Sequence, residues 1–363
     1  MRVLIVSASM GGGHDGAARE LCRRLEERGH QVRTEDLLSA FPLRAGAFLR
    51  RAYEWQLRVA PWSYEASYQM WYSKPSRAGP LSTAVAAATG RVIRRWIAEL
   101  RPDVVVSTYP LASLMLGRER QRGALDAPVA TFITDFAVHP LWTHPGVDEH
   151  LCVHPQAAAD VVGQMGGMAS APGPLVPARF TSSLPPRVQA RAALNFTGDD
   201  RIVLLVAGAW GVGDIAETFD DVSATGRYTP LVVCGRNEKL RRRIAGRGTG
   251  KVLGWTDEMP ALIAASDALV QNAGGLTCME AFAAGLPVVS YRPIAGHGIG
   301  NASAMERAGV AAWARSPEDL GGILDDVTGP RRQELVDAGR AMFAGDPTDA
   351  VERLVASNLR GRP

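Results

Sequence analysis

A glycine-rich turn that opens into a helix has the clearest chemical potential in this sequence. The apolar run 268–271 is followed by Asn-Ala-Gly-Gly-Leu-Thr-Cys-Met-Glu, which ends at Glu280. Backbone amides of Gly274, Gly275 and Leu276 would be unpaired at such a helix start, and the helix dipole adds positive potential there. Glycines also let a ligand approach the backbone closely. We therefore expect this turn, through Thr277, to bind phosphate.

The same segment allows a purely structural interpretation. Thr277 and Glu280 have the spacing of a capping box, in which the glutamate folds back onto its own helix start. A glutamate held in that way is not free to bind a ligand. The residues of this segment alone do not decide between the two interpretations.

A second glycine-rich turn lies near the start of the chain, after the apolar run 2–8. Gly12 and Gly13 lead directly into His14, whose neutral imidazole could accept a proton from an attacking hydroxyl group. Asp135 ends another apolar run and is the second candidate for this base. It could instead orient the histidine or cap a turn, and a histidine in a loop can also be merely solvated.

Four histidines and a cysteine gather within a short stretch and raise the alternative of a metal site. They are His139, His144, His150, Cys152 and His154. Their spacing follows no standard ligand pattern, and His139 and His144 each precede proline in an irregular stretch. We therefore expect no metal.

An aromatic and basic stretch, residues 41–72, interrupts the regular pattern of the chain. It holds nine of the 24 Phe, Trp and Tyr residues. Its most informative members are Arg50, Arg51, Tyr53 and Trp55 in a helical pattern, and Trp62 beyond it. A basic amphipathic helix followed by aromatic residues suits a membrane headgroup interface. The alternative is a helix whose aromatic residues belong to the core.

Short apolar runs rich in β-branched residues alternate with helical patterns through most of the sequence. This alternation predicts a doubly wound α/β fold with parallel sheets. The pattern occurs twice, and residues 171–186, rich in proline and small residues, predict a linker about which the domains could close. We expect domains at 1–175 and 186–345, with a closing helix at 346–363 for which packing on the first domain is one arrangement. Ligands would bind where the glycine-rich turns meet, at the strand carboxyl ends.

The composition excludes several classes of protein. Of 363 residues, 46% are hydrophobic and 21% charged, as in ordinary globular proteins, and a net charge of +3 gives no argument for nucleic acid. The four cysteines are scattered, which suits a reducing compartment. Neither a signal peptide nor a membrane-spanning run is evident. We expect a cytoplasmic protein, peripheral on the inner face of the cell membrane.

Several motifs together resemble nucleotide-sugar glycosyltransferases of the GT-B fold, in particular monogalactosyldiacylglycerol synthases and lipid II N-acetylglucosaminyltransferases. The segment 271–287 resembles their donor-site signature. Four further stretches agree with it: Gly-Gly-Gly-His ending at His14, Thr-Asp-Phe around Asp135 with His139 and Trp142, the loops around Arg236 and Trp255, and Gly-Asn ending at Asn301. The likeness covers most of the chain.

The resemblance implies two Rossmann-like domains that face each other across a cleft. It also implies an inverting transfer of a hexose from a UDP-sugar to a lipid acceptor, which the aromatic stretch suggests is diacylglycerol-like, without a cofactor. The donor side would comprise the pyrophosphate turn 274–277, Glu280 at the ribose, Arg236 and Trp255 beside the base, and Gly211, His297 and Asn301. The acceptor side would include Gly12, Gly13, His139 and Trp142.

The sugar loop departs from the family pattern, because His297-Gly298 stands where a polar pair such as Gln-Glu is usual. The resemblance therefore does not extend to galactose as the donor sugar. The turn around Gly211 could also serve only to pack a strand against a helix. Three other functions stay open: a nucleotide-sugar epimerase of the same fold, a glycosyltransferase with a soluble natural-product acceptor, and a non-catalytic nucleotide-sugar sensor.

Overall fold

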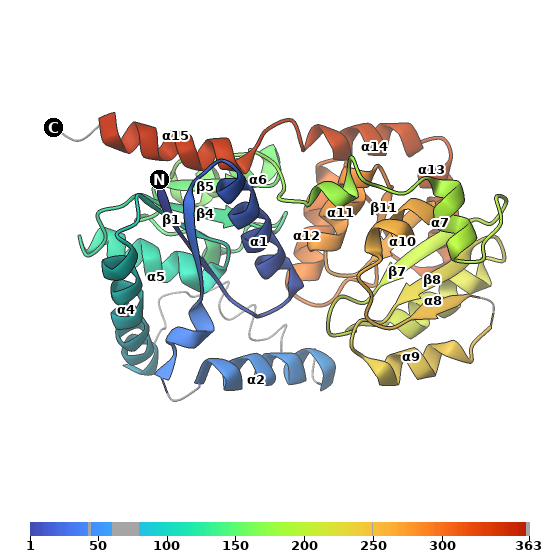
Figure 1. Cartoon of the computed structure of the whole chain (residues 1–363). Coiled ribbons are helices and arrows are strands. Elements are labelled where there is room, and N and C mark those ends of the chain that lie inside the picture. The colour runs from blue at the N-terminus through green and yellow to red at the C-terminus, as the bar shows by residue number, and fades with distance from the viewer. Residues whose placement is uncertain (43–44, 60–79, 249, 361–363) are drawn as a thin grey trace. The chain divides into compact units, whose positions relative to one another are not determined.

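The chain folds into two compact units, which are shown in the computed structural model of Figure 1. Unit 1 comprises Met1–Leu175 and Met342–Pro363, and unit 2 comprises Val176–Ala341. The structure describes residues 1–42, 45–59, 80–248 and 250–360.

Unit 1 is built on a six-stranded parallel sheet with the strand order β2-β1-β3-β4-β5-β6. The strands are β1 (Arg2–Ser7), β2 (Gln31–Asp36), β3 (Val104–Ser107), β4 (Val129–Ile133), β5 (Glu149–Cys152) and β6 (Ala169–Ser170). Every residue of β3 and β4 is buried. Strands buried on both faces read as continuous apolar runs, which is why the sequence pattern predicts them.

Helices cover this sheet and complete the core of unit 1. They are α1 (Gly12–Glu27), η1 (Leu37–Ala40), α2 (Ala45–Val59), α4 (Pro80–Leu100), α5 (Pro110–Gln121), η4 (Pro140–Trp142), α6 (Pro155–Met165) and α15 (Pro347–Arg360). Leu4 and Val6 of β1 pack with Ile93 and Trp96 of α4 and Leu116 of α5 in one hydrophobic cluster. Each such side chain, when fully buried, stabilises the fold by roughly 1.5–3 kcal/mol before entropy is counted.

The helix α15, at the end of the chain, belongs to unit 1 and is joined to it by ion pairs. Arg28, at the end of α1, lies 2.7 Å from Asp346 and 3.0 Å from Glu352. Nε2 of His30 lies 2.7 Å from Glu352. These acidic groups gather around the amino-terminal half of α15 and the basic groups around the carboxyl end of α1, so each set also complements its helix dipole.

Unit 2 repeats the architecture with a second six-stranded parallel sheet in the order β12-β11-β10-β7-β8-β9. Its strands are β7 (Ile202–Val206), β8 (Thr229–Val233), β9 (Lys251–Leu253), β10 (Ala268–Gln271), β11 (Val288–Tyr291) and β12 (Ala312–Ala314). Its helices are η5 (Ala178–Phe180), α7 (Arg187–Ala193), α8 (Ile215–Ala224), α9 (Glu238–Ala245), α10 (Met259–Ala265), α11 (Leu276–Ala284), α12 (His297–Arg307), α13 (Pro317–Thr328) and α14 (Arg332–Ala341).

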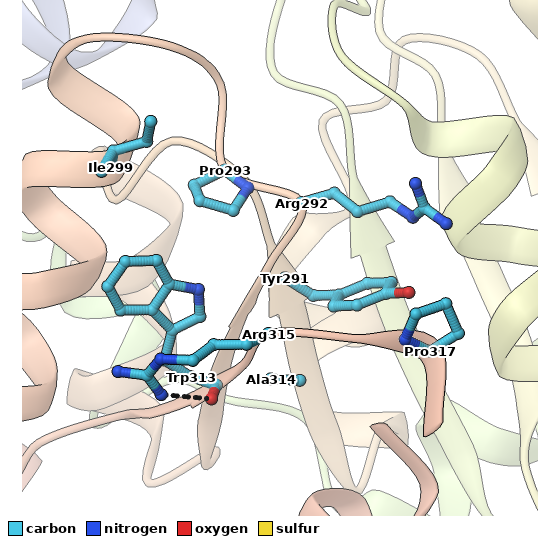
Figure 2. Close-up of a pocket in the computed structure, with 8 residues that line it drawn as sticks. All are labelled: Tyr291, Arg292, Pro293, Ile299, Trp313, Ala314, Arg315 and Pro317. Atoms are coloured by element: carbon cyan, nitrogen blue, oxygen red, sulfur yellow. Dashed lines mark hydrogen bonds between the residues drawn. The ribbon is translucent and has the colours of Figure 1, made fainter. Parts of the chain in front are cut away.

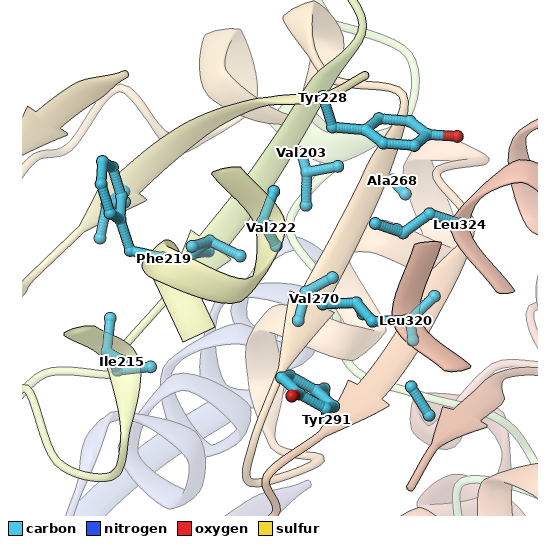
Figure 3. Close-up of a cluster of buried hydrophobic side chains, with 14 of the residues drawn as sticks. Val203, Ile215, Phe219, Val222, Tyr228, Ala268, Val270, Tyr291, Leu320 and Leu324 are labelled. Atoms are coloured by element: carbon cyan, nitrogen blue, oxygen red, sulfur yellow. The ribbon is translucent and has the colours of Figure 1, made fainter. Parts of the chain in front are cut away.

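The core of unit 2 is formed where the sheet packs against the helices α8 and α13. Val203 and Val270 pack with Phe219 of α8 and with Leu320 and Leu324 of α13, as Figure 3 shows. Two parallel sheets, each in alternation with helices, confirm the predicted doubly wound α/β class. Within the residues that the structure describes, no helix is both long and apolar enough to cross a membrane.

Candidate active site

The glycine-rich turn of unit 1 places His14 at the carboxyl edge of the sheet. Helix α1 starts at Gly12, a few residues after β1 ends, and His14 is its third residue. The residue before the helix is Gly11, whose φ of 145° lies in the region that favours glycine. A β-carbon at Gly12 would meet no atom within 4 Å, so the turn borders open space. Ligands of doubly wound sheets bind at this edge.

Hydrogen bonds to one ring nitrogen fix the tautomer of His14. Nδ1 lies 3.0 Å from the carbonyl oxygen of Thr108 and 3.2 Å from Oγ1 of Thr134. A carbonyl oxygen only accepts, so Nδ1 carries the hydrogen and donates it. The neutral ring then keeps its lone pair on Nε2, which is the atom that can take up a proton.

Partial burial favours the neutral form of this imidazole. Desolvation lowers the pKa of His14 below its ordinary value of 6.5, and this effect outweighs the opposing influence of Asp135, the Thr108 carbonyl and Asp15. A histidine with a lowered pKa is unprotonated at neutral pH and so can act as a base.

Asp135 is held by Trp142 and not by the histidine. Nε1 of the fully buried Trp142 donates to Oδ2 of Asp135 across 3.1 Å. Nδ1 of His14 is oriented by Thr108 and Thr134, so Asp135 influences the ring through its charge. Of its two predicted alternatives to the role of base, orienting the histidine would act through the charge of Asp135.

The clustered histidines shape the loops of unit 1. Three of them accept a hydrogen bond from a backbone N–H through Nδ1: His139 from Leu141, His144 from Gly146 and His154 from Gln156. The fourth, His150, is fully buried, and its Nδ1 lies beside the Met168 carbonyl oxygen. In the described part of the chain, no three His, Cys, Asp or Glu side chains converge to hold a metal ion. His139, predicted on the acceptor side, is only 7% exposed and caps η4.

Helix α2 has an exposed face that mixes aromatic and basic side chains. Phe48 is 75% and Trp55 60% exposed, and Arg50 and Arg51 are exposed as well. Tyr53 lies on the opposite face, where it packs against the core cluster. This position corrects the expectation that Tyr53 belongs with the surface residues. Trp62 lies outside the described residues.

In unit 2, the predicted phosphate turn opens α11 without a capping box. The helix starts at Leu276 with Gly275 as its N-cap residue and no side-chain cap. Thr277 is therefore already inside the helix, and Glu280 does not fold back to it. Glu280 is only 7% exposed, yet its carboxylate makes no hydrogen bond to any residue that the structure describes.

The unpaired amides at this helix start agree only in part with those that the sequence predicted. The side chain of Gln271 accepts from the amides of both Ala273 and Gly274, so the Gly274 amide is not available to a ligand. The amides of Gly275, Leu276 and Thr277 have no partner among the described residues. A set of three adjacent free amides at a helix start is a site for an anion. The three free amides thus lie one residue later than the three that the sequence predicted.

Asn301 supports this turn through a hydrogen bond. It is 1% exposed, and its Nδ2 donates to the carbonyl oxygen of Ala273 across 3.0 Å. Gly274 has a φ of 77°, and a β-carbon there would come within 2.5 Å of Asn301. The structure thus shows that Asn301 supports the turn, and its predicted contact with the donor stays a prediction.

Glu280 has an unusual charge environment. Burial raises the pKa of its carboxyl group to about 8, and the positive charge of Arg179 opposes this shift. Arg179 is exposed, lies over the Phe180 ring and makes no ion pair within the described residues. Sequence reasoning missed Arg179. An arginine within the proline-rich stretch 171–186 was the signal that could have found it.

Two predicted donor residues lie against each other. The guanidinium carbon of Arg236 lies 4.5 Å from the centre of the Trp255 ring, and Trp255 is 52% exposed. They follow the ends of β8 and β9, so the sheet brings two distant loops together. An exposed indole beside a cation offers a stacking surface for a planar ring.

Gly211 and His297 lie on loops that are fixed by packing. Gly211 is buried, and a β-carbon there would come within 2.4 Å of Asn237. Close packing therefore explains this glycine, in agreement with the predicted packing alternative, and its contact with the donor stays a prediction. His297 is the first residue of α12, and its loop is tied to the phosphate turn by a 2.8 Å bond from the Ile294 amide to the Asn272 carbonyl. His297 thus lies on a loop that is fixed directly to the phosphate turn.

A separate hollow of about 320 Å³ lies at the ends of β11 and β12 (Figure 2). Its lining residues are Tyr291, Arg292, Pro293, Ile299, Trp313, Ala314, Arg315 and Pro317. Arg292 is paired with Asp221 and Arg315 with Glu306, so both cations are already compensated. None of the predicted donor residues lines this hollow.

Comparison with known proteins agrees with this geometry. Residues 14–167 match the family model of monogalactosyldiacylglycerol (MGDG) synthase, and residues 201–324 match that of glycosyl transferases group 1. The chloroplastic monogalactosyldiacylglycerol synthase of Spinacia oleracea is 27% identical over 98% of this chain and 71% of its own length. A processive diacylglycerol beta-glucosyltransferase of Bacillus cereus (strain AH187) is 24% identical over 98% of this chain and 94% of its own length.

Solved structures share the fold over almost the whole chain. MurG of Acinetobacter baumannii has a TM-score of 0.59 at 16% identity and covers 99% of both chains. Anabaena HepE in complex with UDP-glucose has a TM-score of 0.58 at 14% identity and covers both chains fully. The chain is a glycosyltransferase of the GT-B fold.

The two family models cover different candidate residues. The first begins at His14 and includes Asp135, and the second includes the start of α11 and Glu280. The predicted resemblance to glycolipid glycosyltransferases is thereby confirmed.

Proposed function

We propose that this glycosyltransferase moves a hexose from a UDP-sugar to a diacylglycerol-type lipid, with inversion at the anomeric carbon. The observation that carries the proposal is the start of α11, where three free amides lie on the same helix as a buried carboxylate without a hydrogen bond. Relatives named for glycosyl transfer to diacylglycerol align with 98% of the chain, which supports the acceptor class. A fold neighbour holds UDP-glucose, which supports the donor class.

The donor would bind to unit 2. Its diphosphate accepts from the amides of Gly275, Leu276 and Thr277, and Arg179 adds a positive charge nearby. Glu280 accepts from the ribose hydroxyl groups, which supply the hydrogen bonds that the buried carboxylate lacks. Arg236 and Trp255 offer a planar surface to the base. Because helix amides and an arginine stabilise the departing diphosphate, no metal ion is needed for that step.

The transfer would use the base of unit 1. The acceptor hydroxyl oxygen attacks the anomeric carbon from the face opposite the diphosphate, and its proton passes to Nε2 of His14. The bond between the anomeric carbon and the diphosphate oxygen breaks, and its electron pair leaves with UDP. The imidazolium that forms is stabilised by the charges of Asp135 and Asp15, both of which favour the protonated ring.

The acceptor would come from a membrane surface. Phe48 and Trp55 expose large apolar rings on α2 beside Arg50 and Arg51. Aromatic rings insert at the headgroup level, and arginines attract anionic lipids. We infer that the enzyme works as a peripheral protein on the cytoplasmic face of the membrane.

The direct test is a donor and acceptor panel. The full-length enzyme is incubated with diacylglycerol in anionic vesicles and with UDP-glucose, UDP-galactose, UDP-N-acetylglucosamine or GDP-mannose, and glycolipid is measured by mass spectrometry. We expect transfer from a UDP-sugar, with the opposite anomeric configuration in the product. An epimerised donor without acceptor would indicate an epimerase, and UDP binding without turnover on any acceptor would indicate a sensor.

A further inference from the structure

We propose that Tyr109 is a positioning residue for His14. Its ring and the indole of Trp142 hold the imidazole in one orientation and cover it from solvent, so that Nε2 can accept a proton. This inference rests on the proposed role of His14 as the base. Tyr109 belongs to none of the motifs that predicted the site.

The backbone of Tyr109 is fixed by two serines. Its carbonyl oxygen accepts from Oγ of Ser107 at 2.9 Å and from Oγ of Ser113 at 3.1 Å, and its amide donates to Ser107 at 3.2 Å. The preceding residue, Thr108, supplies the carbonyl that holds Nδ1 of His14. One short segment therefore both hydrogen-bonds the imidazole and presents a ring to it.

Two aromatic rings from different elements confine His14. The Tyr109 ring meets it edge-to-face, with centroids 5.1 Å apart and planes at 78°. The Trp142 ring lies 5.7 Å away at 54°, and it is itself fixed by Asp135. The hydrogen bonds at Nδ1 leave the ring able to tilt about that side, and these contacts restrict the tilt. A base must be held within hydrogen-bond reach of the proton that it takes.

The same rings cover part of the imidazole, which is partly buried. The charged groups that act on His14 are Asp15 on its own helix and Asp135 on the loop before η4, and both favour the protonated form. The side chain of Tyr109 is the third titratable group here, and burial raises the pKa of its hydroxyl, so it stays neutral. Desolvation is thus what keeps His14 unprotonated. Loss of the Tyr109 ring would admit water and raise the pKa of His14.

The test compares Tyr109→Leu, which removes the ring, with Tyr109→Phe, which keeps it. Trp96→Leu is the control, because Trp96 belongs to the same hydrophobic cluster and is not a ring neighbour of His14. The imidazole of His14 is titrated by NMR in isotope-labelled full-length enzyme and assigned by its loss in His14→Gln. The pH dependence of kcat and the KM for the donor are measured in parallel.

In Tyr109→Leu, the pKa of His14 should rise towards 6.5. The acid limb of the rate profile should move to higher pH with it, since the protonated ring is inactive. We expect kcat at mildly acidic pH to fall roughly 10-fold to 100-fold, with the donor KM nearly unchanged. Tyr109→Phe and Trp96→Leu should keep the wild-type profile. If Tyr109→Leu does not fold, Tyr109→Met, which fills the space with a flexible chain, carries the same expectation.

An unchanged His14 titration in a folded Tyr109→Leu or Tyr109→Met protein would overturn the inference. So would an equal shift in Trp96→Leu, since the effect would then be general loosening of the core. The NMR titration needs no turnover. If the wild-type enzyme transfers no sugar, the proposed function fails while the positioning of His14 is still measured.

Discussion

Among single residues, the candidate site depends on neighbouring side chains that lie far away in the sequence and belong to none of the motifs. The sequence predicted helix starts just before His14 and a few residues before Glu280, because glycine-rich turns after apolar strands are local signals. It could not show that Gln271 occupies the Gly274 amide or that Asn301 lies buried under the turn. Both facts depend on side chains that tertiary packing brings together. Arg179 was missed for the same reason.

The raised pKa of Glu280 predicts a pH-dependent affinity for UDP. The protein alone holds this carboxyl group with a pKa of about 8, so it is largely protonated at neutral pH. Ribose hydroxyl groups that donate to it favour the ionised form, so UDP binding should lower the pKa and release a proton. Affinity should therefore rise with pH towards 8 and then level off.

Calorimetry of UDP binding in buffers of different ionisation enthalpy measures this proton release. Glu280→Gln, which cannot ionise, should bind UDP with an affinity that is nearly constant over the same pH range. A wild-type affinity that does not change between mildly acidic and mildly basic pH would show that the ligand does not contact this carboxylate.

At the scale of elements, the strands and most helices follow from the apolar pattern alone, because buried parallel strands are continuous apolar runs. The faces of α2 were harder to predict. The sequence showed an amphipathic helix, but Phe48 and Trp55 are exposed while Tyr53 packs inward. Which aromatic side chains reach the core depends on where the neighbouring elements η1 and α4 pack, and this is not encoded in the helical period.

The exposed face of α2 predicts membrane binding. Phe48→Ser combined with Trp55→Ser should weaken binding to anionic vesicles by roughly 10-fold or more, since each ring would bury apolar surface worth about 1–3 kcal/mol. Sedimentation with vesicles measures the bound fraction. Val188→Ser is the matched control, because Val188 is 80% exposed on α7 and is not part of this face. Equal binding of the double variant and the wild type would exclude α2 as the membrane contact.

At the scale of the whole molecule, the repeated alternation of strands and helices predicted two doubly wound sheets, and the structure confirms this fold class. The boundary at residue 175 or 176 falls inside the proline-rich stretch 171–186. The sequence could not show how the last helix is held. Its contacts with Arg28 and His30 join residues more than 300 positions apart.

The division of labour between the units predicts that two variants fail in different ways. His14→Gln should reduce kcat roughly 100-fold to 10,000-fold, the usual contribution of a general base, while UDP affinity stays within about twofold. The reason is that the base and the donor-binding groups lie in different units. Turnover kinetics and UDP calorimetry on the same preparations measure both quantities. Undiminished turnover in His14→Gln would remove this residue from the mechanism.

In the proposed donor complex, the buried carboxylate of Glu280 accepts hydrogen bonds from the ribose hydroxyl groups of a nucleotide whose diphosphate lies on the start of α11. The most direct measurement is a calorimetric cycle with UDP and 2′,3′-dideoxy-UDP on the wild-type enzyme and on Glu280→Ala. We predict that removing the hydroxyl groups weakens binding to the wild type roughly 10-fold to 100-fold and has almost no further effect on the variant, as for two groups in contact. If the losses of binding free energy from Glu280→Ala and from the missing hydroxyl groups simply add when the variant binds 2′,3′-dideoxy-UDP, Glu280 does not contact the ribose.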